Sequence, residues 1–173
     1  ENKTVGDETV AVTEQYAYDA NNQLTQVIYA DGSVTQVEYN SIGKISAATD
    51  AKGRRTSYSY DAFGNLTKIT YSDNTTETFT YDAEGRNTSA TDRQGRTMSM
   101  SYDKVGNLLS VTYPNGATRG YTYDALYRVT AITDLNGGIT EYVYDALGRN
   151  TAIVDPLGNR TVFAYNSLSQ LTS

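Results

Sequence analysis

The 173-residue sequence contains no cysteine, no histidine and no tryptophan, and only two prolines. Without cysteine the chain forms no disulfide and has no thiolate ligand, so cysteine usage indicates nothing about its compartment. Without histidine and cysteine, the Ser-His-Asp and Cys-His forms of nucleophilic catalysis are excluded. The glycines are spaced one turn apart and are not gathered into a phosphate-binding loop. These absences remove the commonest catalytic arrangements.

Long apolar runs and concentrated positive charge are also absent. No segment is both apolar enough and long enough to span a bilayer, and Glu1 does not open a signal-peptide pattern. The net charge is -6, and the lysines and arginines are scattered rather than arranged in a basic stripe. We therefore expect no membrane span and no nucleic-acid partner.

Tyrosine is abundant, with 16 residues, and it recurs at a fixed interval. Eight dipeptides of Tyr followed by Asp or Asn are separated by 21 residues each time, without an insertion. A period of this size predicts a stacked repeat array. The tyrosines of these dipeptides, called the anchor tyrosines below, are Tyr18, Tyr39, Tyr60, Tyr81, Tyr102, Tyr123, Tyr144 and Tyr165.

Each repeat is expected to form two strands and two turns. The segments 66–71 and 77–81 are rich in β-branched and aromatic residues, which favour strands. Alternation places Thr67, Ile69 and Tyr71 on one face, and it makes one face of the sheet aromatic and aliphatic and the other mostly Thr, Ser and Ala. Turn, strand, turn, strand at uniform spacing predicts an all-β array of antiparallel hairpins.

The turn after each anchor tyrosine carries Asp first and Gly fourth, as in Asp61–Gly64, which predicts a type I turn with a following Gly bulge. Asn22, Tyr127 and Ser169 replace the glycine in three repeats, and we expect a local deviation at Tyr127 because a bulky side chain resists positive φ. The glycine is present as Gly43, Gly64, Gly85, Gly106 and Gly148.

A longer period of 42 residues lies above the 21-residue repeat. Eleven residues after each anchor tyrosine the chain alternates between Tyr and Asp until the last member, so neighbouring hairpins are not equivalent. This position is occupied by Tyr29, Asp50, Tyr71, Asp92, Tyr113, Asp134 and Asp155.

These motifs resemble the RHS repeat, also called the YD repeat, in which Gly is followed by Tyr-x-Tyr-Asp-x-x-Gly-Arg/Asn-Leu. The segments 53–66 and 137–149 show the pattern, and the resemblance covers about residues 13–173. The resemblance implies a spiralling β-sheet, or solenoid, of stacked hairpins. In RHS-family polymorphic toxins, insecticidal toxin complexes and teneurin-like proteins such a sheet closes into a shell, and the shell can enclose a toxic domain. Such arrays have also been linked to carbohydrate binding and cell–cell contact.

Two segments depart from the full-length pattern of the family. Residues 1–12 fall outside the register, and we interpret them as a lead-in strand around 9–13 or as a degenerate repeat. Asp155-Pro156-Leu157-Gly158 has a faint likeness to the family's self-cleavage element, but it lies in the ordinary turn register and is interpreted as a turn. Residues 13–173 are then interpreted as eight repeats that stop within a strand at the C-terminal end, as one segment of the wall. The chain begins at Glu1 without an initiating Met, and we interpret it as a piece of a longer protein.

Open strand edges at such a stop would expose unpaired backbone groups. We therefore expect the partners to be further repeats of the same chain or identical chains, and filaments would form if head-to-tail contacts did not close. Carbohydrate and an enclosed toxin domain are the other expected partners.

The repeated Asp is interpreted as a turn-former, since a glycosidase needs one carboxylate pair and a calcium site needs converging oxygens. The column Asp50, Asp92, Asp134 and Asp155 could attract cations as an alternative, but we expect no cofactor, no metal site and no enzymatic activity. The aromatic residues that stand two positions before the anchor tyrosines form a row on one face of the sheet, and their role has two open interpretations. Their rings either form the core or, if exposed, present Tyr58, Tyr121 and Tyr142 as platforms for sugar rings.

Five Asn-x-Ser/Thr sequences are potential glycosylation sites if the source glycosylates secreted proteins, namely Asn2, Asn65, Asn74, Asn87 and Asn159. From the residues and the resemblance together, the leading hypothesis is a non-catalytic scaffold. It would be a wall segment of a secreted or cell-surface protein, in a toxin-enclosing shell or an extracellular filament. The alternative is a carbohydrate-binding adhesion module that uses exposed tyrosines.

Overall fold

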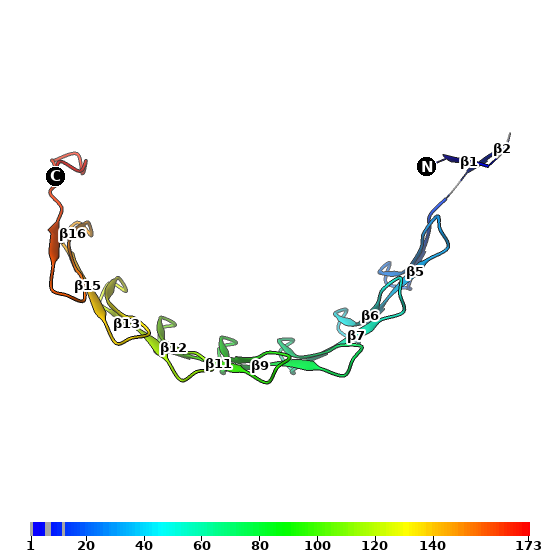
Figure 1. The fold of residues 1–173 in the computed structure, drawn as a ribbon, viewed down its shortest axis with the longest axis horizontal. Helices are drawn as coiled ribbons and strands as arrows, with labels where there is room; N and C mark the ends of the chain where they lie inside the picture. The colour runs from blue at the N-terminus through cyan, green and yellow to red at the C-terminus, as the bar shows by residue number, and fades with distance from the viewer. Residues whose placement is uncertain (1, 6–7, 12) are drawn as a thin grey trace. The chain divides into compact units, whose positions relative to one another are not determined.

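The computed structural model describes residues 2–5, 8–11 and 13–173, with side chains from residue 13 onward. The described residues form seventeen β-strands and no helix, so the predicted all-β class is confirmed (Figure 1). Strands β3–β17 follow one another in chain order in one sheet, and β1 and β2 pair separately. The chain divides into two units, residues 1–85 with 91–95 and residues 86–90 with 96–173, which are described separately below.

The first unit contains nine strands, each paired with the next along the chain from β3 onward. They are β1 (Asn2–Val5), β2 (Glu8–Ala11), β3 (Gln15–Tyr18), β4 (Leu24–Ile28), β5 (Val34–Tyr39), β6 (Ile45–Thr49), β7 (Arg55–Tyr60), β8 (Leu66–Thr70) and β9 (Thr76–Tyr81).

The second unit contains the rest of the meander, and its strands repeat the same lengths. They are β10 (Asn87–Thr91, whose last residue belongs to the first unit), β11 (Thr97–Tyr102), β12 (Leu108–Thr112), β13 (Thr118–Tyr123), β14 (Val129–Thr133), β15 (Ile139–Tyr144), β16 (Asn150–Val154) and β17 (Arg160–Val162).

A β-bulge interrupts six of the hairpins that anchor tyrosines close. In the β7–β8 pair Ser59 faces Lys68 and Tyr60 faces Leu66, so Thr67 is the extra residue. The Thr67 hydroxyl donates to the Ser59 carbonyl at 3.2 Å. The expected grouping of Thr67 with Ile69 stays a prediction, because Thr67 is paired with no residue of β7. Directly paired residues share a face, which places Leu66 and Ile69 with Tyr60 and Tyr58.

Both kinds of turn are three-residue loops whose third residue is left-handed. In the turn 61–65 the Gly64 N–H donates to the Asp61 carbonyl at 3.1 Å, and Gly64 has a φ of 85°. In the turn 71–75 the Asn74 N–H donates to the Tyr71 carbonyl at 3.0 Å, and Asn74 has a φ of 65°. This is the type I turn followed by a left-handed bulge residue that the Asp-to-Gly spacing predicted.

The two kinds of turn lie at opposite ends of the hairpins. The turns that follow the anchor tyrosines form what we call the YD edge, at residues 19–23, 40–44, 61–65, 82–86, 103–107, 124–128, 145–149 and 166–170. The other turns form the opposite edge, at residues 29–33, 50–54, 71–75, 92–96, 113–117, 134–138 and 155–159.

The deviation expected at Tyr127 does not occur. Tyr127 adopts a φ of 62° and donates its N–H to the Asp124 carbonyl at 3.0 Å, as Gly148 does to Asp145. The turn keeps its geometry because the surrounding hairpin imposes it, and Tyr127 bears the strain of a left-handed conformation. Its side chain is 60% exposed, so the ring meets no obstacle.

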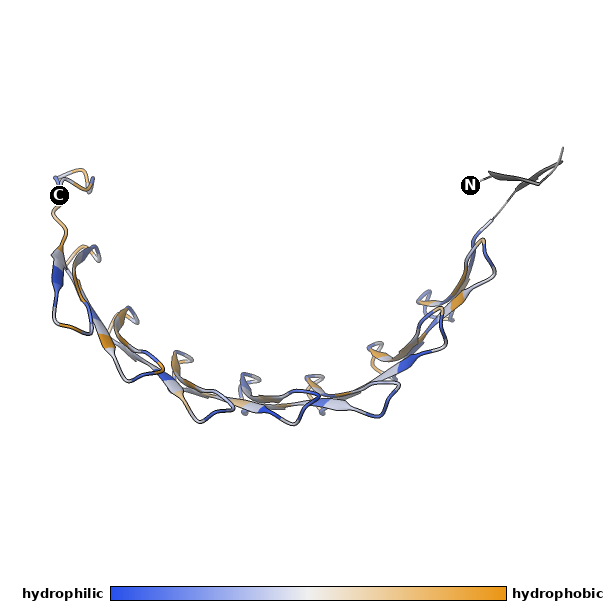
Figure 2. Ribbon diagram, in the orientation of Figure 1, coloured by the Kyte–Doolittle hydropathy of each residue, from blue (hydrophilic) through white to orange (hydrophobic). Residues whose placement is uncertain are grey.

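The sheet is a single layer and encloses no large side chain. Among residues 13–173, Ala47 and Ala152 are the only buried hydrophobic residues, at 1% and 0% exposure. Hydrophobic and hydrophilic residues both occur on the strands, and hydrophobic residues also occur at several turns (Figure 2). Stability within each unit therefore comes from backbone pairing and from contacts between neighbouring hairpins, since no interior is available.

The predicted lead-in strand at 9–13 corresponds in part to β2, which ends at Ala11, whereas Val12 lies outside the described residues. At the other end, Tyr165 and Leu171 form an isolated bridge, and the Thr172 N–H donates to the Ala164 carbonyl at 2.8 Å.

Candidate functional site

The anchor tyrosines link each hairpin to the one before it. Seven of the eight donate their hydroxyl to a backbone carbonyl fifteen residues earlier, as Tyr60 does to Ile45 at 2.8 Å and Tyr144 to Val129 at 2.9 Å. The accepting residue begins the strand beside the bulge of the preceding repeat. The other links join Tyr39 to Leu24, Tyr81 to Leu66, Tyr102 to Asn87, Tyr123 to Leu108 and Tyr165 to Asn150.

Basic side chains add a second link at the YD edge. The Arg128 Nε donates to Asp124 Oδ2 at 2.7 Å within its own turn, and its Nη1 donates to the Asp145 carbonyl of the next turn at 3.3 Å. The guanidinium also lies 4.6 Å from the centre of the Tyr144 ring. Arg86 and Arg149 make the same two contacts with the following repeat. An arginine at the last position of these three turns therefore joins one repeat to the next.

A groove of about 680 Å³ lies on the tyrosine face of the first unit, and it is the candidate site of this chain. Strands β5, β6 and β7 form its floor. Ala48 pairs with Val37 on one side and with Thr56 on the other, so these three residues share the face that Tyr58 occupies. The groove is lined by Thr35, Gln36, Val37, Ala48, Thr49, Asp50, Arg54, Thr56, Tyr58, Tyr71, Ser72, Asp73 and Arg93.

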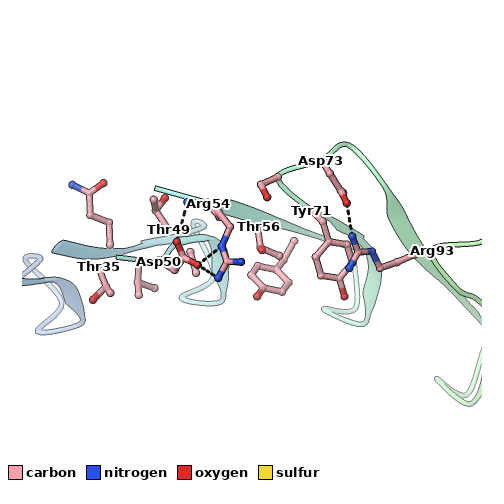
Figure 3. Close-up of a pocket in the computed structure, with 13 residues that line it drawn as sticks. Thr35, Thr49, Asp50, Arg54, Thr56, Tyr71, Asp73 and Arg93 are labelled. Atoms are coloured by element: carbon pink, nitrogen blue, oxygen red, sulfur yellow. Dashed lines mark hydrogen bonds and ion pairs between the residues drawn. The ribbon is translucent and has the colours of Figure 1, made fainter. Parts of the chain in front are cut away.

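The opposite edge supplies the polar walls of the groove (Figure 3). Asp50 Oδ2 accepts from Arg54 Nε at 2.7 Å, and Asp50 Oδ1 accepts from the Arg54 backbone N–H at 3.0 Å. The hydrogen bond from the Arg54 side chain is the main cause that lowers the pKa of Asp50. The Asp50 carboxylate therefore closes its own turn and is fully engaged.

Arg93 forms the second wall and spans two neighbouring turns. Its guanidinium lies 4.2 Å from the centre of the Tyr71 ring and donates to Asp73 Oδ2 at 2.5 Å and to Thr75 Oγ1 at 2.8 Å. The Tyr71 hydroxyl donates to Glu77 at 3.0 Å, and burial, followed by this hydrogen bond, raises the pKa of Tyr71. The hydrogen bond from Thr75 is the first cause that lowers the pKa of Asp73.

The tyrosines predicted as sugar platforms are half-buried rather than enclosed or fully exposed. Tyr58 lines the groove described above, and Tyr142 lines a second, more apolar hollow of about 470 Å³ with Phe163, Ile153 and Leu171. Tyr58 and Tyr142 therefore have different surroundings. Whether these rings bind sugars or only pack against their neighbours stays a prediction.

The potential glycosylation sites differ in their surroundings. The side-chain amides of Asn65 and Asn159 donate to Asp61 and Asp155 at 3.0 and 2.8 Å, Asn87 is half-buried in β10, and Asn74 is exposed at a turn. The side chain of Asn2 lies outside the described residues. In the described part of the chain no three His, Cys, Asp or Glu side chains converge in a group suited to a metal ion.

Sequence reasoning overlooked the hollow itself. Part of the signal was present nine positions after the anchor tyrosines, where Ala48 and Ala90 replace the Val or Ile of the other repeats. A small residue between two β-branched neighbours leaves space on a single-layer sheet, since nothing else fills it.

A single-layer antiparallel sheet of 21-residue hairpins, tied together through Tyr-Asp motifs, defines a YD-repeat scaffold. A family model described as the teneurin YD-shell matches residues 1–173, and the chain belongs to that family. The match includes residues 1–12, which the repeat register alone had set apart. Among the described residues, no helix is long and apolar enough to cross a membrane.

Solved structures share the fold at low sequence identity. The TcdB2-TccC3-Cdc42 structure has a TM-score of 0.65 at 17% identity, covering 98% of this chain and 11% of the other. The Tc holotoxin pore of Photorhabdus luminescens has a TM-score of 0.62 at 18% identity, with coverages of 98% and 11%. This chain thus spans about a tenth of the length of these relatives. No curated protein sequence matches it.

Proposed function

We propose that this chain is a non-catalytic segment of the wall of a YD-repeat shell in a secreted or surface-exposed protein. The repeated hydroxyl-to-carbonyl link between hairpins is the observation that supports this role most directly. It gives a sheet without an enclosed core a second set of contacts along its length. Family membership supports the same conclusion.

An enclosed toxin domain is the partner that this role favours. One solved structure with the same fold is named as a Tc holotoxin pore, and that description belongs to that protein. For this chain the enclosed partner is a proposal, as is the surface filament that identical chains would form through open strand edges.

Electron microscopy of the natural protein separates these architectures. Discrete hollow particles would support the wall of a shell, and protease treatment of intact particles should then spare an internal fragment that is digested once the particles are opened. Continuous filaments with an axial repeat would replace the shell by a fibre. Small monodisperse particles without a cavity or an axial repeat would contradict both forms of the proposal.

A second candidate function, carbohydrate binding and adhesion, is favoured by the position of Tyr58 in the polar groove. The variants Tyr58→Ala and Tyr142→Ala test it by circular dichroism and by binding to a glycan array. Retained folding with weaker glycan binding supports platforms. Loss of folding indicates that the rings act by packing, and unchanged binding contradicts the candidate.

A further inference from the structure

A small residue lies on the floor of the groove of the first unit. Nine residues after the anchor tyrosine, β6 carries Ala48 and another repeat carries Ala90, whereas the other repeats carry Val or Ile, such as Val27, Ile69 and Ile132. The paired neighbours of Ala48, Val37 and Thr56, are no larger than Val, so the floor between them is low. A groove of about 680 Å³ falls within the range of roughly 300–1,000 Å³ that small-ligand sites occupy.

The charges that border the groove cancel one another. Asp50 pairs with Arg54 at 2.6 Å and Asp73 pairs with Arg93 at 2.5 Å. Neither an anion nor a cation would meet a surplus of opposite charge here, because each carboxylate already faces a guanidinium. The groove is therefore suited to an uncharged ligand.

Hydroxyl groups give the groove its unused hydrogen-bonding capacity. Over residues 13–173, the chain supplies no hydrogen-bond partner to the side-chain hydroxyls of Thr35, Thr56 or Tyr58. Each can both donate and accept, and Arg54 and Arg93 hold further N–H donors beyond those in their ion pairs. Together these groups can pair with several ligand hydroxyls at once.

Apolar surface lies between these polar groups. The side chains of Val37 and Ala48 and the ring of Tyr58 line the same groove as the threonine hydroxyls. A ligand that fits must present C–H faces and hydroxyl edges in close alternation, which is the chemistry of a pyranose ring. Purely apolar molecules would leave the hydroxyls unpaired, at a cost in affinity.

We propose that this groove binds a short neutral oligosaccharide, with Tyr58 against a sugar face and the threonine hydroxyls on its edge. The inference deepens the second candidate function and rests on it for the ligand class, but it is independent of the wall role. The proposal places sugar binding at one groove of the first unit, beside Ala48. It does not require binding at every predicted platform, Tyr58, Tyr121 and Tyr142.

The repeats supply a substitution that fills the groove without breaking the pattern. Ala48→Ile introduces the residue that the same position has at Ile69, Ile132 and Ile153, and Ala90→Ile makes the same change at the equivalent position of another repeat. The test measures binding of neutral trisaccharides of glucose, galactose and N-acetylglucosamine to the intact natural protein by titration calorimetry. A trisaccharide containing glucuronate serves as the charged comparison.

We expect at least one neutral trisaccharide to bind saturably. Ala48→Ile should weaken it by about tenfold or more, as loss of pocket space does, while Ala90→Ile binds like the unaltered protein. Tyr58→Phe should weaken binding less than Ala48→Ile. Equal weakening by Ala48→Ile and Ala90→Ile, preference for the glucuronate ligand, or no binding of any neutral sugar would overturn the inference. Hollow particles of the unaltered protein seen by microscopy alongside absent sugar binding would leave the wall role standing.

Discussion

The two edges of the sheet use the same three-residue turn for different purposes. At the YD edge the turns are tied to their neighbours: Arg128 and Arg149 reach the backbone of the next turn and stack on its tyrosine. At the opposite edge a turn such as 50–54 is closed mainly by its own side chains. Arg93 is an exception there, because it reaches the preceding turn.

This difference explains why one edge repeats closely and the other varies. At the YD edge the tyrosine hydroxyl reaches the preceding hairpin and the arginines reach the next turn. The Asp carboxylates close their own turns, as do the amides of Asn65 and Asn107. A turn that satisfies itself is free to alternate between Tyr and Asp. The groove lies beside the opposite edge. Sequence changes there alter the surface without removing the hydrogen bonds between anchor tyrosines and the preceding hairpins.

Valine at the turn glycines should show the largest difference between the edges. Gly64 is buried with a φ of 85°, and an added Cβ would lie 2.9 Å from Lys44 Cε, whereas Gly53 has a φ of 76° and open space. We expect Gly64→Val to cost about 2–3 kcal/mol and Gly53→Val about 1–2 kcal/mol, since both carry left-handed strain. Urea unfolding measures both. Equal costs would show that the YD edge is no more tightly packed than the other.

Removing one arginine from each edge sharpens the comparison. Arg128→Met should cost about 1–1.5 kcal/mol, because it loses an ion pair, a contact with the Tyr144 ring and a hydrogen bond to the next turn. Arg54→Met should cost about 0.5 kcal/mol or less, because its ion pair is exposed and lies within its own turn. The midpoint of urea unfolding reports each change. A larger effect at Arg54 would reverse the assignment of the two edges.

The contribution of an anchor hydroxyl to stability can be compared with that of another tyrosine hydroxyl on the same strand. Tyr144→Phe leaves the carbonyl of Val129, a half-buried residue, without its side-chain donor and should cost about 1 kcal/mol. Tyr142→Phe is the matched control, since the Tyr142 hydroxyl has no hydrogen-bond partner within residues 13–173. Thermal unfolding of the two variants compares them. If Tyr142→Phe proved as costly as Tyr144→Phe, the link between hairpins would not be what the anchor hydroxyl contributes.

The smallest expected effect is a dependence on pH. The backbone N–H of Arg149, helped by its guanidinium, lowers the pKa of Asp145. A carboxyl with a lowered pKa in the folded state adds stability above its unfolded pKa of about 3.9, and that contribution is lost as the pH falls through the folded pKa. Asp145→Asn should retain the turn, since Asn40 accepts the same N–H bonds from Ile42 and Lys44.

The variant Asp145→Asn should therefore lose less stability than the unaltered protein between pH 5 and pH 2, compared by urea unfolding at each pH. An equal slope for both proteins would mean that the Asp145 charge contributes nothing to the turn. The opposite edge offers Asp50→Asn as the parallel case, whose pKa is also lowered, chiefly by the side chain of Arg54.

Periodicity predicted the parts of the fold that depend on local rules. Strand positions followed from β-branched residues between turn signals, and left-handed positions followed from glycine at a fixed offset from Asp. Tyr127 escaped this reasoning because the hairpin overrides the preference of one residue. The bulge at Thr67 escaped it because alternation on one strand does not show where the partner strand is one residue short.

The candidate site was harder to predict for a different reason. Tyr58 was identified from the sequence as a possible platform. Its neighbours across the sheet depend on the strand register, which pairs Ala48 with Val37 and Thr56. Arg93 lies in the turn that follows the turn of Tyr71. No sequence pattern indicated that its guanidinium would lie over the Tyr71 ring. The contacts between neighbouring repeats were therefore the part of the candidate site that the sequence did not predict.

The fifteen-residue reach of the anchor hydroxyl limits how such a chain can change in length. Duplicating or deleting a whole 21-residue unit leaves every hydroxyl opposite a carbonyl of the hairpin before it. An insertion of any other size between an anchor and its acceptor would misplace that one donor while leaving the rest of the ladder intact. Growth by whole repeats therefore preserves every link. The turns of the opposite edge lie between acceptor and anchor, as the turn 50–54 lies between Ile45 and Tyr60, so an insertion there that shifted the strand register would break one link.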